Sequence, residues 1–397
     1  MMNISYFIRK QSLLISKISI EFIRTDYIAH LNEDEKLVGI IGARGVGKTT
    51  LLLQYLKMST DKYLYFSADD VVFQDLKLYD LVDEAYSLGR KVIVIDEIHK
   101  YRNWAGEIKN IYDSFPDIKI RISGSSMINI LFEKYDLSRR LVLFRVPHLS
   151  FREFLSMKLS KTFERFELED ILTNAEKISS SLVFENDELY ALFKEYLEYG
   201  AYPFFIEGKK NFSKKLFNAL DKVINEDIPS LNKIDYAHII VFKKLIFRLV
   251  EAGKPFQVNV AKLSREFGIS EPTLYTYFDI LEKSRIFTPL KKYSTKISKK
   301  PEKLLFSNSN ILYSYANEFE KEVEIGTVRE TFFVNCFEKI FYSDIGDFKV
   351  DKYLFEVGGK NKSFKQIKDV ENSFVVADMD YTVDNKKIPL WLFGFLV

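Results

Sequence analysis

The chain has 397 residues, of which 47% are hydrophobic and 15% aromatic, so it can bury a large core and is not a disordered polypeptide. Its 58 lysines and arginines nearly balance 56 acidic residues, so net charge points to no class of partner and any nucleic-acid surface has to be local. The single cysteine, Cys336, excludes an internal disulfide, and no apolar run is long enough to cross a bilayer, so we expect a cytoplasmic protein without a membrane partner.

A phosphate-binding loop is predicted near the start of the chain, where residues 42–49 read G-x-x-x-x-G-K-T. An apolar run at 37–41 predicts a buried strand before this loop, and residues 50–57 predict a helix after it. Glycines let backbone N–H groups turn toward phosphate oxygens, and a helix amino terminus adds partial positive charge. The alternative is a glycine-rich turn that matches by chance, which the flanking strand and helix disfavour.

This motif predicts the nucleotide ligands. Lys48 is expected to reach the β- and γ-phosphates of ATP, and the Thr49 hydroxyl is expected to bind Mg²⁺. The other residues expected around the nucleotide are Gly42, Ala43, Arg44, Gly45, Val46, Gly47 and Thr50. ATP and Mg²⁺ are therefore the cofactors that the sequence predicts.

A second motif lies about fifty residues downstream, where the apolar run 91–95 ends in Asp96 and Glu97. Such a run is typical of a central parallel strand that is buried on both faces. Asp96, at the carboxyl end of this strand, is expected to hold Mg²⁺ through water, and Glu97 is expected to act as general base on the attacking water. A solvated turn is the alternative for this carboxylate pair, and the upstream phosphate-binding loop disfavours it.

Further apolar runs at 63–66, 118–122 and 141–146 alternate with helical segments, which predicts an α/β fold with a parallel P-loop sheet covered by helices on both faces. Ser123, after one of these runs, is the candidate sensor of the γ-phosphate and Ser125 the second, with a turn or helix-capping serine as the equal alternative. Arg140 or Arg139 is the candidate arginine that stabilises phosphate charge in its own subunit or a neighbour's, with a surface arginine pair as the alternative.

These motifs resemble those of the prokaryotic AAA+-type ATPases related to origin-recognition and signal-transduction ATPases. The segments that carry the resemblance are 42–50, 94–100, 122–126, 139–140, 147–154 and 199–203. The resemblance implies an ATPase core over residues 1–160 and a helical lid over 161–235. It also implies that Pro203, in the sequence Gly200-Ala201-Tyr202-Pro203, lies near the adenine, where an ordinary helix end followed by a proline turn is the alternative.

Residues 236–300 are predicted to form a winged helix, because two helices at 260–267 and from 271 onward flank a short turn. From residue 254 to residue 303 there are 11 basic and 5 acidic residues, so this segment has a net charge of 11 − 5 = +6. The basic residues of the wing and the segment after it are Lys291, Lys292, Lys296, Lys299 and Lys300. Sequence-blind DNA contact is therefore expected, and a protein interface or internal lever is the alternative.

The C-terminal domain, residues 301–397, resembles the restriction-endonuclease-like domain found at this end of related ATPases. The resemblance implies that Asp347 and Glu356 are metal-binding carboxylates, with Gln366 assisting. It places a lysine two residues after the glutamate, whereas Lys360 follows Glu356 by four residues. The favoured alternative is a catalytically inactive module that mediates interactions. A helix is expected over residues 330–342, before the strands of this domain.

Three hypotheses of function follow. The first is an ATPase that couples its nucleotide state to the winged helix and the C-terminal module and contacts DNA. The second is a nucleotide-gated switch that controls assembly or partner docking with incidental turnover. The third is a defence-type effector with a metal-dependent nuclease domain. A homo-oligomer or a protein partner is compatible with each of them.

Overall fold

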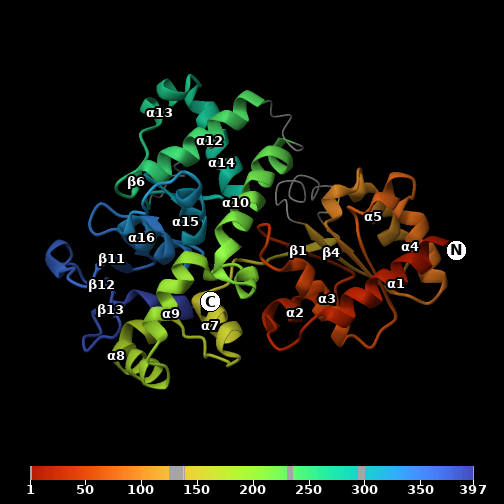
Figure 1. Ribbon diagram of the computed structural model, residues 1–397, viewed down its shortest axis with the longest axis horizontal. Coiled ribbons are helices and arrows are strands. Elements are labelled where there is room, and N and C mark those ends of the chain that lie inside the picture. Colours follow the sequence, from red (N-terminus) through yellow and green to blue (C-terminus); the bar gives the residue numbers. More distant parts are fainter. Residues whose placement is uncertain (1, 125–136, 138, 230–235, 294–299, 397) are drawn as a thin grey trace. The chain divides into compact units, whose positions relative to one another are not determined.

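The computed structural model describes residues 2–124, 137, 139–229, 236–293 and 300–396, and it divides into two compact units (Figure 1). Unit 1 comprises Met1–Pro147 and unit 2 comprises His148–Val397. None of the helices within these described ranges is long and apolar enough to span a membrane.

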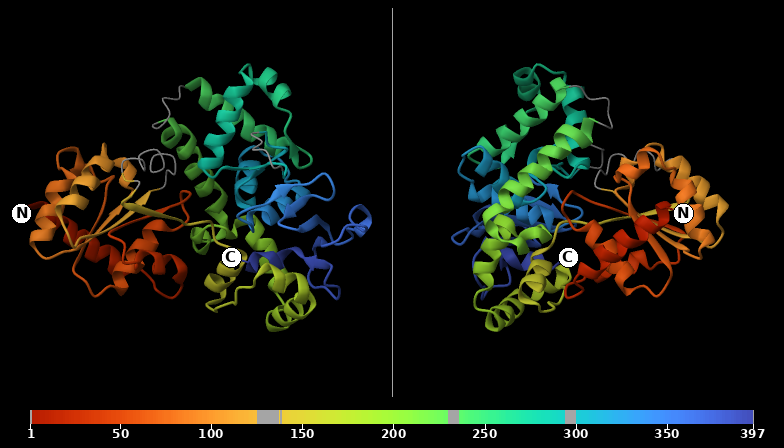
Figure 2. Two further views of the ribbon diagram at one scale, coloured as in Figure 1. Left: turned by 180° about the vertical axis from the view of Figure 1, so that it is seen from behind. Right: turned by 45° about the vertical axis from the view of Figure 1, so that its right-hand side comes forward.

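Unit 1 is an α/β domain built on a five-stranded parallel sheet with the strand order β2-β3-β4-β1-β5. Its strands are β1 (Leu37–Ile41), β2 (Tyr63–Ser67), β3 (Val92–Asp96), β4 (Lys119–Gly124) and β5 (Leu141–Arg145). Its helices include α1 (Met2–Lys17), α2 (Thr25–Leu31), α3 (Lys48–Met58), α4 (Leu78–Ser87) and α5 (Trp104–Ser114). Helices cover both faces of the sheet (Figure 2), which confirms the predicted fold class.

The sequence explains the central strands of this sheet. Every residue of β1 (LVGII) and of β3 (VIVID) is buried, as expected for parallel strands covered on both faces. β4 lies between β1 and β3, and Ile95 of β3 pairs with Ile122 of β4. This register brings the next residues, Asp96 and Ser123, to the same carboxyl edge of the sheet.

Helix α1 lies along the edge strand β2 and closes one side of the sheet. The Phe7 ring is completely buried there, against the rings of Phe66 and Phe73. The Gln11 side chain accepts a hydrogen bond of 2.7 Å from the backbone N–H of Tyr65, an edge-strand group that has no neighbouring strand on that side. Helix α1 therefore both buries apolar surface and satisfies an exposed strand edge.

Unit 2 contains two sheets. The first is antiparallel, has the order β6-β8-β7 and follows helix α12 (Tyr236–Glu251). Two further helices lie between β6 and β7 along the chain. The second sheet is mixed and has the order β13-β12-β11-β10-β9. The elements of the first part are β6 (Phe256–Gln257), α13 (Val260–Phe267), α14 (Glu271–Lys283), β7 (Phe287–Leu290) and β8 (Lys303–Phe306). The elements of the mixed sheet are β9 (Phe341–Tyr342), β10 (Phe348–Val350), β11 (Tyr353–Gly359), β12 (Ser373–Asp378) and β13 (Lys387–Pro389).

The remaining helices of unit 2 pack on one another and in part on these sheets. They are α7 (Phe151–Leu159), α8 (Leu168–Glu185), α9 (Leu189–Glu195), α10 (Phe212–Lys222), α15 (Ser309–Glu318) and α16 (Ile325–Asn335). The Phe193 ring of α9 meets the Phe332 ring of α16 at 4.9 Å, and Asp378 of β12 accepts hydrogen bonds from Tyr190 of α9 and Arg329 of α16. The helices predicted as a separate lid therefore pack in one unit with the C-terminal sheet.

The helix predicted over residues 330–342 begins and ends earlier than expected. The Glu324 carboxylate accepts the N–H groups of Gly326 and Thr327, which caps α16 at its amino end. The helix ends at Asn335, and the aromatic residues Phe341 and Tyr342 form strand β9 instead. The error arose because buried aromatic residues are compatible with either structure when the segment is short.

Candidate nucleotide-binding site

The loop between β1 and α3 has the backbone geometry of an anion cradle. Gly45 and Gly47 have φ angles of 85° and 93°, a left-handed conformation that glycine adopts without strain. A Cβ atom on Gly42 would lie 2.3 Å from the carbonyl oxygen of Val146, so only glycine fits there. Helix α3 begins at Lys48, directly after the loop, so its amino terminus faces the space that the loop encloses.

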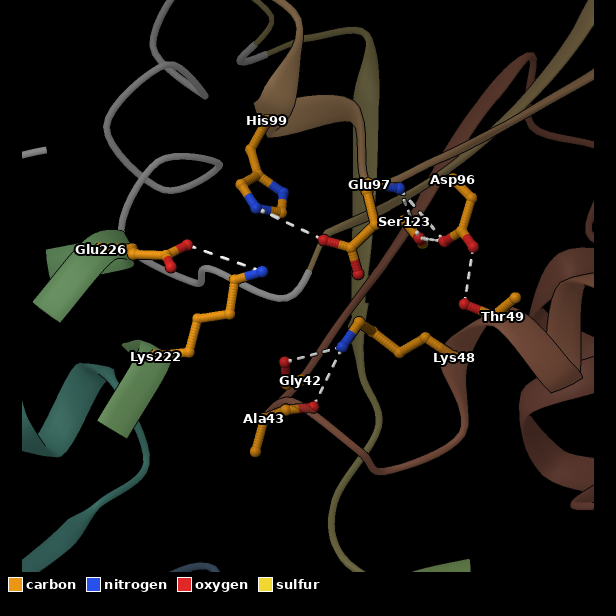
Figure 3. Close-up of polar contacts among 10 residues, drawn as sticks. All are labelled: Gly42, Ala43, Lys48, Thr49, Asp96, Glu97, His99, Ser123, Lys222 and Glu226. Atoms are coloured by element: carbon orange, nitrogen blue, oxygen red, sulfur yellow. Dashed lines mark hydrogen bonds and ion pairs between the residues drawn. The ribbon is translucent and has the colours of Figure 1, made fainter. Parts of the chain in front are cut away.

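Lys48 is buried at this helix terminus, with only 4% of its surface exposed. Its ammonium group donates to the carbonyl oxygens of Gly42 at 3.1 Å and Ala43 at 3.0 Å (Figure 3). A buried ammonium group and a helix amino terminus both favour an anion. The loop therefore fits a phosphate group, and Lys48 can exchange its loop carbonyls for phosphate oxygens.

Three oxygen-bearing side chains form a connected chain beside the loop (Figure 3). The Thr49 hydroxyl donates to Asp96 Oδ2 at 2.6 Å, and the Ser123 hydroxyl donates to Asp96 Oδ1. Asp96 is 2% exposed, and burial raises its pKa while the hydrogen bonds from Ser123 and Thr49 oppose that shift. The Tyr65 hydroxyl lies 3.2 Å from Asp96 Oδ2. Hydroxyl and carboxylate oxygens in this arrangement fit Mg²⁺, which prefers oxygen ligands.

Glu97 follows Asp96 in a backbone conformation that is rare for a residue with a side chain. Its φ angle is 49°, and its N–H group donates to Asp96 Oδ1 at 3.1 Å and to Ser123 Oγ at 3.2 Å. Strained conformations of this kind concentrate at functional sites. The Glu97 carboxylate is 20% exposed and lies 3.4 Å from Nε2 of His99. The structure therefore brings Lys48, Thr49, Asp96, Glu97 and Ser123 together at one edge of the sheet.

Arg140 lies elsewhere. It immediately precedes β5, and Leu141 pairs with Leu37 at the amino end of β1, whereas the phosphate-binding loop follows the carboxyl end of β1. Its guanidinium group donates to both carboxylate oxygens of Asp113 at 3.1 Å. This placement at the opposite edge corrects the expectation that Arg140 reaches phosphates in its own subunit, and only a role toward a neighbouring subunit remains as a proposal. Arg139 is exposed at the same edge.

The other predicted site residues lie outside this edge or outside the described residues. Ser125 falls among the residues that the structure does not describe. Pro203 begins a short 3-10 helix, Pro203–Glu207, in unit 2, and its contact with adenine remains a prediction.

The predicted nuclease-like residues also belong to unit 2, where Asp347 and Glu356 are neighbours through the main chain. Asp347 Oδ2 accepts the N–H of Val357, the residue after Glu356, at 2.9 Å. Lys360 does not join them, because its side chain is 73% exposed and lies 3.9 Å from Asp380. Lys362 contacts Glu356 Oε1 instead. The expectation that Lys360 serves this cluster is therefore corrected: Gly358 leaves room for the stem of Lys362 to cross it.

Four residues of the nucleotide site in unit 1 and of the carboxylate cluster in unit 2 were not predicted from the sequence. The sequence did not indicate that Tyr65 contacts Asp96, because a tyrosine in a buried strand usually contributes to packing. Lys303 lies 2.8 Å from Glu330 and 3.7 Å from Asp347, and these three residues meet only through packing between distant segments. The pair Gly358-Gly359 was the available signal for Lys362, since adjacent glycines permit a close approach of another side chain.

The strand order of unit 1, its phosphate-binding loop and the Asp96 carboxylate are those of a P-loop nucleotide-binding domain. In agreement, residues 34–155 match the family model of the AAA domain. Residues 190–322 match the model of a domain of unknown function. An uncharacterised protein of Methanocaldococcus jannaschii is 29% identical over 329 residues, which span 75% of this chain and 68% of that relative.

Two solved structures to which the chain is similar share little sequence with it. The RuvB Holliday-junction branch-migration motor of Thermotoga maritima is 13% identical, with coverage of 80% of this chain and 95% of its own and a TM-score of 0.27. The ORC1 protein of Aeropyrum pernix, solved in complex with DNA, is 11% identical, with coverage of 74% and 91% and a TM-score of 0.31. TM-scores this low carry no inference about function.

Proposed function

We propose that unit 1 binds ATP together with Mg²⁺ and hydrolyses it. The observation that carries this proposal is the connected group Thr49–Asp96–Ser123 beside Lys48, with Glu97 next to it at the carboxyl edge of the sheet. Hydrolysis of ATP needs an anion cradle, oxygen ligands for a metal and a base near the γ-phosphate. The residues at this edge supply each of these.

Each residue has a distinct role in this proposal. The loop N–H groups and Lys48 bind the β- and γ-phosphates, while Thr49 and Asp96 hold Mg²⁺, which neutralises phosphate charge when bound. Glu97 takes the proton of the attacking water. Ser123 fixes Asp96 and the backbone N–H of Glu97, so it positions the carboxylates and is placed to sense the γ-phosphate.

The contact between Glu97 and His99 favours a second candidate, a nucleotide-gated switch with slow turnover. A carboxylate that contacts histidine is less available to a water proton until nucleotide binding moves it. Such a protein would bind ATP tightly, retain ADP and turn over slowly. Protein partners would then read the state of unit 1.

Steady-state hydrolysis with Mg²⁺ or with excess EDTA tests the first proposal. We expect turnover with Mg²⁺ and a loss of at least about 100-fold with EDTA, because metal charge stabilisation contributes several kcal/mol. Turnover that is negligible in both conditions, with ADP retained through gel filtration, would support the switch. Failure to bind either nucleotide in the presence of Mg²⁺ would exclude both candidates.

We further propose that unit 2 contacts DNA without reading its sequence. The element order α12–β6–α13–α14–β7–β8 is compatible with the predicted winged helix, which supports this proposal. Glu271 and Asp279 are exposed on α14, and Asp279 pairs with Lys283, so this helix offers little positive charge. The basic side chains after β7, Lys291 and Lys292, are better suited to phosphate contacts, and phosphate would displace the exposed ion pair of Lys292 with Asp344, which contributes about 0–1 kcal/mol.

A salt titration of duplex DNA binding tests this surface. The double variant Lys291→Ala/Lys292→Ala is expected to weaken binding at low salt and to lower the slope of log K against log salt by about one per lost phosphate contact. Lys283→Ala is the control for loss of a lysine on α14, the helix that offers little positive charge. Absence of DNA binding by the wild type at low salt would leave a protein interface as the function of this module.

A further inference from the structure

We propose that the carboxylate cluster of the C-terminal sheet carries its own cations, Lys303 and Lys362, where a nuclease-like site would hold a divalent metal. The cluster then fastens β8 to the C-terminal sheet without metal and cleaves no nucleic acid. The carboxylates are Glu330 of α16, Asp347 before β10 and Glu356 of β11. The residues present do not fit the metal that the resemblance implies.

Lys303 is the first of these cations and lies inside the cluster. It is on β8, an element of the antiparallel sheet, and its side chain is only 8% exposed. Its ammonium group lies 2.8 and 3.0 Å from the two carboxylate oxygens of Glu330 and 3.7 Å from Asp347 Oδ1. The buried Lys303 ammonium group lies between these carboxylates, where a metal ion would otherwise bind. It also supplies the positive charge that a metal ion would supply there.

Lys362 is the second cation, and it neutralises Glu356, which is 2% exposed. Its stem passes over Gly358, where a Cβ atom would lie 2.6 Å from Lys362 Cδ, so glycine at this position makes the approach possible. The amide nitrogen of Gln366 donates to Glu356 Oε2 at 3.3 Å in the orientation that satisfies both groups. Both oxygens of Glu356 therefore have donors within the chain.

A divalent ion would meet repulsion and few open ligands here. It would lie beside one buried ammonium group and one partly buried one, and Asp347 Oδ2 already accepts the N–H of Val357. Both carboxylate oxygens of Glu330 already accept hydrogen bonds from the Lys303 ammonium group, so they are not open ligands for a metal. Glu330, Asp347 and Glu356 are not arranged as a group of three carboxylates that could share one metal ion.

Mn²⁺ binding to the full-length protein without nucleotide tests the proposal, with electron paramagnetic resonance as the readout. The wild type and its Glu356→Gln variant are expected to bind Mn²⁺ equally weakly, and neither nicks supercoiled DNA in Mg²⁺ or Mn²⁺. Lys362→Met is expected to raise Mn²⁺ affinity by about tenfold through removal of one charge, and Glu356→Gln is expected to cancel that gain. Lys360→Met, on an exposed lysine four residues after Glu356, is the matched control and should match the wild type.

Thermal unfolding supplies a second readout, because Lys303→Met removes a buried cation and destabilises unit 2. Mn²⁺ is expected to restore part of that stability in Lys303→Met and to leave the wild type unchanged in the same buffer without nucleotide. Mn²⁺ binding or nicking by the wild type that Glu356→Gln abolishes would overturn the proposal. Equal Mn²⁺ gains in Lys360→Met and Lys362→Met would overturn it as well. Neither result depends on ATP hydrolysis by unit 1.

Discussion

Replacing Glu97 with glutamine is expected to lower ATP turnover by about 10²- to 10⁴-fold while ATP affinity stays within a few-fold of the wild type. Glutamine keeps the size of the side chain but cannot take a proton from water. The backbone N–H of Glu97, which donates to Asp96 and Ser123, is unaffected by the substitution. The effect therefore falls on the chemical step and not on nucleotide binding.

Single-turnover hydrolysis and equilibrium binding of ATP, measured on the same preparation, separate these two effects. Glu35→Gln is the matched control, because Glu35 is an exposed glutamate of unit 1 that lies before β1. Turnover by Glu97→Gln within threefold of the wild type would show that another group takes the proton. A parallel loss of binding would show that Glu97 holds the nucleotide site together.

Replacing Arg121 with methionine is expected to reduce the free energy of unfolding of unit 1 by about 3–5 kcal/mol. Arg121 lies on β4 and is completely buried. Its guanidinium group donates to the carbonyl oxygens of Leu31 at 2.6 Å, Glu35 at 2.9 Å and Glu33 at 2.9 Å. These carbonyls belong to the last residue of α2 and to the loop after it, and methionine would leave several of them without a donor, at about 1–3 kcal/mol each.

Urea unfolding followed by the fluorescence of Trp104 reports on unit 1. Because Trp391 belongs to unit 2, the measurement is made in a Trp391→Phe background. Arg139→Met, on an exposed arginine of the same unit, is the control and should change stability by less than about 0.5 kcal/mol. A loss below about 1 kcal/mol for Arg121→Met would mean that water replaces the guanidinium donors.

Much of unit 1 could be predicted from sequence because its signals are local. Buried parallel strands are continuous apolar runs, and the phosphate-binding motif fixes the loop between β1 and α3. The hydrogen bond between Ser123 and Asp96 requires β4 to lie beside β3 in the sheet. The order of the motifs along the chain favours this arrangement of strands but does not determine it. Arg140 was predictable in part, since a residue that precedes a parallel strand lies at the edge opposite to the loop.

The resemblance named Asp347, Glu356 and Gln366 of the cluster in unit 2, but its other members, Lys303, Glu330 and Lys362, could not be predicted because they come from separate segments. Lys303 precedes Glu330 by one helix and a turn, and neither has a local signal of pairing. Whether a lysine lies inside an acidic cluster depends on how the two sheets pack together. No short sequence motif specifies that packing. The lysine expected from the resemblance, Lys360, is exposed, and the one that reaches Glu356 is two residues further along.

Unit 1 is proposed to bind ATP through Lys48 and the loop before it. Isothermal titration of ATP with Mg²⁺ into the wild type and into Lys48→Met tests this binding. Lys48→Met is expected to weaken ATP binding on the order of 100-fold, since a charge-assisted contact to phosphate contributes roughly 3 kcal/mol. Equal affinity in the two proteins, or no ATP binding by the wild type, would contradict the claim.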